Sequence, residues 1–235
     1  MKKRAWFSIL MIFLLLGSLE AAEFKRMLGP IFSSYSRPWP GPFSGNYPPL
    51  LDDGSTLSPF RNSRFSFFGG LGLEFALSRI LELEVDVLYK ETGGQYRFDT
   101  GFFDSYRYEF QMRELSFPLL LRGHLWKKSR PFILAGLNPS FILSHRYQLF
   151  HRAEASRIFE KVEEADIKGY TGKMDLALVL GLGFEAAVNR RRVAVECRYE
   201  LGLANLYNGL VTEPGVSPAR VRSRQLLLVI SYVVE

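Results

Sequence analysis

Residues 81–89 read Leu-Glu-Leu-Glu-Val-Asp-Val-Leu-Tyr, a nearly strict alternation of apolar and acidic side chains. Successive side chains of a β-strand point to opposite faces, so this stretch predicts a strand with one apolar face and one charged face. Similar alternation returns over residues 175–185 and 193–202. The chain is therefore expected to be all-β.

Eight segments carry strand patterning of this kind. We expect strands at Phe24–Tyr35, Phe65–Leu77, Leu81–Tyr89, Tyr106–Leu125, Pro131–Leu143, Met174–Ala187, Val193–Ala204 and Arg222–Val234. In the fourth of these, the apolar positions change parity near Arg113. A β-bulge inserts one extra residue and has this effect, so we predict a bulge there.

The connections between these strands alternate between long and short. The short turns are Ser78–Ile80, Trp126–Arg130 and Val188–Arg192, and the long loops are Ser36–Asn62, Thr92–Ser105, Ser144–Thr171 and Asn205–Ala219. Outer-membrane barrels have short periplasmic turns and long extracellular loops. The pattern thus predicts an eight-stranded antiparallel up-and-down transmembrane β-barrel, with both termini on the periplasmic side.

A soluble β-sandwich also alternates apolar and polar residues along its strands. In a sandwich, Leu83 and Leu178 would face a protein core, whereas in a membrane barrel they would face lipid. Loop asymmetry and aromatic residues near strand ends, such as Tyr106 and Trp126, favour the membrane. The soluble alternative stays open at this point.

The first 22 residues have the layout of a secretory signal peptide. Basic residues 2–4 precede an apolar stretch, Ala5–Leu16, and small residues follow up to Ala22. The apolar stretch is shorter than the roughly twenty residues of a membrane-spanning helix. We expect residues 1–22 to be a signal peptide and residues 23–235 to form a single outer-membrane barrel domain.

The cysteine count and the net charge limit the classes of protein to which this chain can belong. The single cysteine, Cys197, excludes an internal disulfide, so stability must come from packing and sheet hydrogen bonds. The formal net charge of +6 is mild and dispersed. We therefore expect no nucleic-acid partner.

If the apolar strand faces meet lipid, the polar faces point into the barrel. A barrel of about eight strands has an interior just wide enough for its side chains. Charges held away from water are costly unless paired, so we expect a polar core of ion pairs rather than a channel. The residues expected in this interior network are Glu74, Glu82, Glu84, Asp86, Arg122, His124, Glu185, Glu196, Arg198 and Glu200.

No motif indicates catalysis. Gly69, Gly70 and Gly72 are not followed by a helix pattern, as a phosphate-binding loop would be. Ser144 and His145 are adjacent, and adjacent strand residues face opposite ways, which suits a nucleophile and its base poorly. We expect no catalytic residue, no cofactor and no metal ion.

The chain resembles the PorT-like family of outer-membrane β-barrels, often labelled porin-family barrels. The resemblance covers most of the chain after residue 22 and rests on Gly69–Phe75, Leu81–Tyr89, Gly93-Gly94, Leu115–Leu121, Pro131–Gly136, Gly181–Gly183 and Arg198–Leu203 with Asn205. It implies an eight-stranded bacterial outer-membrane barrel. Most such barrels have no assigned activity, and the prototype is associated with protein secretion.

The sequence thus indicates a non-enzymatic outer-membrane barrel with a structural or interaction role in the cell envelope. Its expected partners are outer-membrane lipid and envelope or secretion proteins that meet its extracellular loops. The charged loop Ser144–Thr171 is either such a partner site or a solvated loop, and a helix or an extended hairpin fits its sequence. The alternatives are an accessory barrel of a secretion system, a lipid-modifying outer-membrane enzyme and a soluble periplasmic β-sandwich that binds a ligand.

Overall fold

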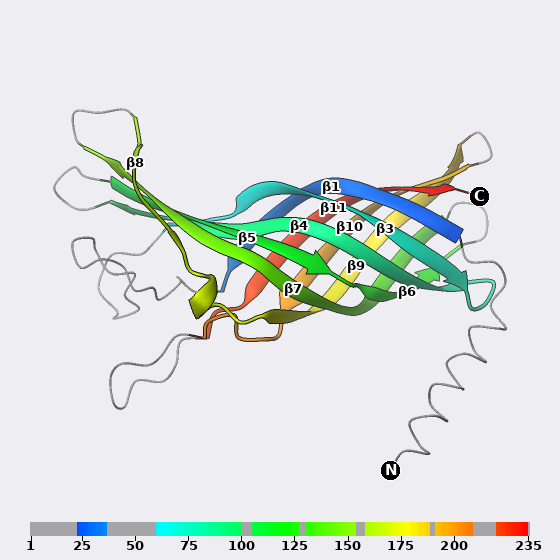
Figure 1. Ribbon diagram of the computed structural model, residues 1–235. Coiled ribbons are helices and arrows are strands. Elements are labelled where there is room, and N and C mark those ends of the chain that lie inside the picture. The colour runs from blue at the N-terminus through cyan, green and yellow to red at the C-terminus, as the bar shows by residue number, and fades with distance from the viewer. Residues whose placement is uncertain are drawn as a thin grey trace, which may run out of the picture.

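A single antiparallel sheet closes into a ring (Figure 1), because its first long strand pairs with its last. The computed structural model describes residues 23–36, 60–99, 105–126, 130–153, 158–188, 191–208 and 220–234. The predicted signal peptide and most of the loops 36–62 and 205–219 lie outside these ranges. The predicted all-β antiparallel barrel is confirmed.

Eleven strands and one short 3-10 helix make up the described part of the chain. They are β1 Glu23–Tyr35, β2 Phe60–Asn62, β3 Arg64–Ala76, β4 Leu81–Asp99, β5 Ser105–Ser116, β6 Leu119–His124, β7 Arg130–Arg152, β8 Glu160–Asp166, η1 Lys168–Tyr170, β9 Met174–Val188, β10 Arg191–Gly202 and β11 Ser223–Val234. No helix in the described ranges is long and apolar enough to cross a membrane.

Eight strand positions pass around the ring in chain order. β5 and β6 share one position, interrupted at Phe117 and Pro118, between β4 and β7. The short strands β2 and β8 pair only with the far ends of β4 and β7. We call the end with the short turns and the C-terminus the turn end, and the opposite end the loop end (Figure 1).

Two of the predicted long loops are largely strand. β4 continues to Asp99 and β5 begins at Ser105, so the expected loop 92–105 is mostly a hairpin. Likewise, β7 continues to Arg152 and pairs with β8, which selects the extended hairpin over a helix in the segment 144–171. Figure 1 shows β5, β7 and β8 projecting at the loop end. The outward-facing residues of these hairpins are polar, so the sequence pattern indicated loops instead of strands.

The predicted bulge lies on a different strand from the one expected. The β5–β7 register does shift between Arg113 and Glu114, but Leu143 of β7 is the residue left without a partner. Along β5, every second residue from Tyr108 to Ser116 stays buried. The parity change near Arg113 has another cause: the inward residues before it are mostly apolar and those after it are polar.

Outward-facing apolar side chains form a continuous band around the ring. On β7 the band runs from Ile133 to Leu143, and on β9 from Leu176 to Phe184. These lengths match the 9–11 residues that cross a bilayer as a strand. Leu178 and Leu180 are exposed on this band instead of facing a protein core, so the soluble sandwich reading is wrong.

The barrel interior is packed, and its chemistry changes along the axis. At the loop end lies a buried aromatic and aliphatic cluster, which we call the loop-end core: Tyr35, Tyr96, Tyr108, Phe110, Met112, Ile142, Tyr147, Leu149, Ile167, Leu206 and Val221. Two smaller apolar clusters line opposite walls nearer the turn end. Between these walls lie the charged side chains described next.

Candidate functional site: the charged interior of the barrel

The interior residues predicted from parity all lie inside the ring. Glu82 is the most exposed of the acidic ones, with 9% of its surface accessible. The strands β3, β4, β6, β9 and β10 supply these side chains, each on the face opposite the apolar band. The buried members are Glu74, Glu82, Glu84, Asp86, Arg122, Glu185, Glu196, Arg198 and Glu200.

Glu84 is the centre of the ionic network. Its Oε2 accepts a hydrogen bond from Arg122 Nη2 at 2.6 Å, and its Oε1 accepts one from Arg198 Nη2 at 2.5 Å. Lys25 Nζ lies 2.5 Å from the same Oε1. Three cations from β1, β6 and β10 therefore share one carboxylate of β4, which ties four strands together across the interior.

Arg122 spans the network toward the turn end. It donates to Glu74 at 2.8 Å and to Glu196 at 2.8 Å, in addition to Glu84. Its guanidinium also lies over the Phe132 ring, 4.3 Å from the centroid. A Cβ on Gly183 would lie 2.5 Å from that ring, so this glycine leaves the space that the ring occupies.

Arg198 completes the network on the other side. It donates to Asp86 at 2.9 Å, and its guanidinium lies 2.6 Å from Glu196. A Cβ on Gly72 would lie 2.2 Å from Asp86 Oδ1, so a glycine is needed opposite this carboxylate. Removing ions from water costs several kcal/mol each, and multiple pairing offsets that cost.

A second polar group lies closer to the loop end. Lys90 Nζ donates to Glu200 at 2.7 Å and to Gln225 at 2.9 Å, and Asn138 also donates to Glu200, at 2.9 Å. Glu114 lies 3.8 Å from Lys90. Of these residues, only Glu200 is among the predicted interior residues. Lys90 lies one residue beyond the predicted strand Leu81–Tyr89, whereas Glu114, Asn138 and Gln225 lie on predicted strands but were not singled out.

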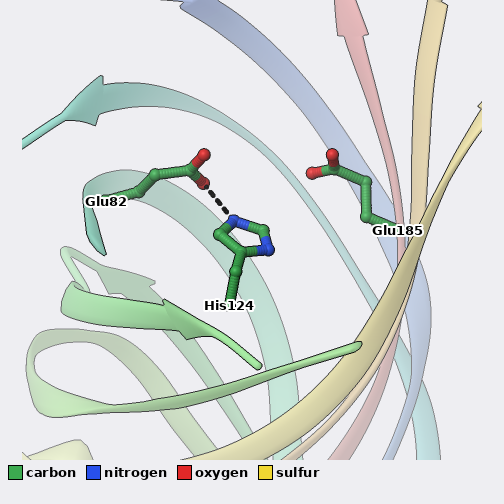
Figure 2. A group of neighbouring side chains, drawn as sticks. All are labelled: Glu82, His124 and Glu185. Atoms are coloured by element: carbon green, nitrogen blue, oxygen red, sulfur yellow. Dashed lines mark ion pairs between the residues drawn. The ribbon is translucent and has the colours of Figure 1, made fainter. Parts of the chain in front are cut away.

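The turn end of the interior holds three ligand-type side chains that converge (Figure 2). His124 Nε2 lies 3.1 Å from Glu82 Oε2, and Glu185 faces them from β9. One atom from each residue lies within 4.8 Å of the others. Arg130 and Arg192 also contact Glu185, at 2.5 and 3.2 Å.

Comparison with known proteins assigns the family. Residues 43–208 match the model of the outer membrane protein beta-barrel domain. The chain belongs to the outer-membrane β-barrel domain family. No curated protein matches it.

Several solved outer-membrane barrels are similar to this chain at low sequence identity. Neisserial surface protein A (NspA) is 12% identical, with 90% of this chain and 98% of that chain covered and a TM-score of 0.40. OprG of Pseudomonas aeruginosa is 13% identical, with 92% and 97% covered and a TM-score of 0.45. Ail of Yersinia pestis, solved with the heparin analogue sucrose octasulfate, is 11% identical, with 92% and 100% covered and a TM-score of 0.38.

Membership in the outer-membrane barrel family sets the orientation of the ring. Such barrels turn their short connections to the periplasm and their long ones outward. The turn end, with Glu82, His124 and Glu185, is therefore periplasmic. The loop end and the β4–β5 and β7–β8 hairpins are extracellular.

The extracellular hairpins of this outer-membrane barrel hold a basic and aromatic cluster. The guanidinium of Arg107 lies 4.6 Å from the ring centroids of both Phe150 and Phe159. Arg152 and Arg97 approach the Phe159 ring at 5.2 and 5.8 Å. Three arginines thus surround one ring, and we call these residues the arginine cluster.

The Ser144 and His145 pair of the outer-membrane barrel is not arranged as a nucleophile and base. His145 is fully buried, and its ring contacts the Tyr35 hydroxyl at 3.1 Å and the Thr171 hydroxyl at 2.8 Å. These contacts place the imidazole in the loop-end core.

On the neighbouring β8, a hydrogen bond from Lys161 lowers the pKa of the solvent-exposed Glu164 carboxyl.

Proposed function

We propose that this outer-membrane barrel is non-enzymatic and does not conduct ions, and that it acts as a scaffold for its extracellular hairpins. The packed interior carries this proposal. A shared carboxylate, Glu84, and its three cations fill the middle of the ring. The loop-end core lies above them, so side chains occupy the axis from the periplasmic half to the outer mouth.

The arginine cluster supports an interaction role outside the cell. Stacking on Phe150 and Phe159 orients the Arg107 guanidinium and leaves its edge as the donor surface. One acidic side chain, Glu109, lies 3.0 Å from Arg107 Nε. Arginine forks match phosphate and sulfate groups, so the partner class we propose is an anionic polysaccharide at the cell surface.

Conductance measurements test the closed interior. The purified full chain, reconstituted in planar bilayers, is expected to give no stable open-channel current. A general porin reconstituted in the same way serves as the positive control. A stable, ohmic current from this barrel would overturn the proposal.

Dextran sulfate is a suitable probe for the arginine cluster, with uncharged dextran as the reference. Replacing Arg107 with Gln is expected to weaken dextran sulfate binding several-fold. The matched control is Arg146→Gln, which removes an exposed arginine from β7 outside the cluster. Equal loss in the two variants, or no binding by the wild type, would contradict the interaction role.

A second candidate follows from the PorT-like resemblance, namely an accessory role in protein secretion. The projecting β7–β8 hairpin offers a surface for such a partner. Deleting the gene and measuring secreted protein would test this role. We further propose that residues 1–22 direct export and are removed, which N-terminal sequencing of the outer-membrane protein would show.

A further inference from the structure

We propose that Glu82, His124 and Glu185 form a binding site for a divalent transition-metal ion such as Zn²⁺ at the periplasmic end of the barrel. Imidazole nitrogen and carboxylate oxygen are ordinary zinc ligands, and three protein ligands leave a coordination position for water. The site is independent of the scaffold role proposed above.

The fold brings these three residues together from separate strands. Glu82 lies on β4, His124 ends β6 and Glu185 lies near the end of β9. One ligand atom from each lies within 4.8 Å of the other two. Figure 2 shows the two carboxylates on either side of the imidazole, so a small shift of each side chain would close the group around an ion.

The buried ring of His124, which has no hydrogen-bond partner in the described part of the chain, also points to a ligand. Only 5% of its side chain is exposed, and neither ring nitrogen has a hydrogen-bond partner among the described residues. The 3.1 Å contact with Glu82 lacks hydrogen-bond geometry. A buried imidazole without such partners is unusual and needs an explanation. A metal ion would satisfy one nitrogen directly.

The site can be reached from the periplasm. A pocket of about 490 Å³ at the turn end is lined by Arg79, Ile80, His124, Leu125, Trp126 and Arg130. His124 therefore borders both the pocket and the carboxylates. An ion that enters the pocket meets the imidazole first.

Three arginines contact the same carboxylates and will compete with a metal ion for them. Arg130 and Arg192 lie 2.5 and 3.2 Å from Glu185, and Arg122 lies 3.8 Å from both Glu185 and Glu82. Each carboxylate oxygen has two lone pairs, so it can hold an arginine and an ion together. Arg130, whose side chain is 40% exposed, can also move away. We therefore expect micromolar rather than nanomolar affinity.

Calorimetric titration of the untagged, detergent-folded full chain with Zn²⁺ tests the site. One equivalent is expected to bind, and His124→Asn is expected to weaken binding at least tenfold. The matched control, His151→Asn, changes a histidine at the opposite end of the barrel and should leave affinity unchanged. Arg130→Gln should tighten binding several-fold, because it removes a competing cation.

Two further measurements keep the outcome decisive. Heat-modifiability on gels reports whether each variant folds. If His124→Asn fails to fold, Co²⁺ absorption of the wild type decides instead: bands typical of nitrogen and oxygen ligands support the site. A sulfur-to-cobalt charge-transfer band would assign the ion to Cys197 and overturn it. No saturable Zn²⁺ binding, or equal binding in His124→Asn and wild type, would also overturn it.

Discussion

Arg122 and Glu84 form a buried ion pair across the barrel interior, with 2.6 Å between Nη2 and Oε2. Both side chains are at most 1% exposed, and the same arginine also holds Glu74 and Glu196. Because this guanidinium partners three buried carboxylates, it should dominate the stability of the interior.

Replacing Arg122 with Met is therefore expected to lower the free energy of unfolding by about 3–5 kcal/mol, since it removes a cation that donates hydrogen bonds to all three buried carboxylates. Urea unfolding of the detergent-folded barrel measures the change. Arg113→Met, at an exposed position on β5, is the control and should change stability by less than about 0.5 kcal/mol. Similar values for the two variants would show that the interior network contributes little.

Gly183→Ala should destabilise the barrel by about 1–3 kcal/mol through overpacking. The new Cβ would lie 2.5 Å from the Phe132 ring and 2.7 Å from the Val195 carbonyl oxygen. Gly123→Ala provides the comparison, because its Cβ would meet only Ile133, at 3.9 Å. The same urea titration applies, and a neutral Gly183→Ala would mean that the ring moves without cost.

Leu180→Arg tests the lipid-facing band. An arginine on the lipid face near the middle of the bilayer costs about 2–4 kcal/mol, so folding into liposomes should lose that much stability. Val162→Arg, at an exposed apolar position on β8 outside the band, should be nearly neutral. If the two variants fold equally well, the band assignment is wrong.

Removing the Lys90 ammonium tests the second polar group. Lys90→Met leaves Glu200 and Gln225 without their shared donor and should destabilise the barrel by about 3 kcal/mol or more. Lys161→Met, which removes an exposed ion pair on β8, should cost less than about 1 kcal/mol. Thermal unfolding followed by circular dichroism compares them.

The ring and most of its interior could be predicted from parity together with the alternation of long and short connections. Alternation assigns each residue to a face, and this placed Glu84 and Arg198 inside without any three-dimensional information. Lys25 escaped notice because β1 contains Pro30 and alternates poorly. The strand ends beyond residue 90 were missed because the inward face becomes apolar there, which reverses the meaning of the pattern.

The turn-end group could not be predicted from the sequence. Glu82 and His124 lie 42 positions apart, and Glu185 lies 61 further on. Their meeting depends on the register of three strands and on side-chain direction at the strand ends. Parity places each of these residues inside the ring, but parity does not specify the position of a residue along the barrel axis.

The reversal of the apolar face along β5 and β7 has a wider consequence. On the turn-end side of Arg113 and Leu143, the apolar side chains of these strands face outward. On the loop-end side, the apolar side chains are buried, as they are in a water-soluble protein. These two neighbouring positions therefore mark where the hydrocarbon layer ends and external water begins. The level of the outer membrane surface can therefore be read from the alternation pattern of the sequence itself.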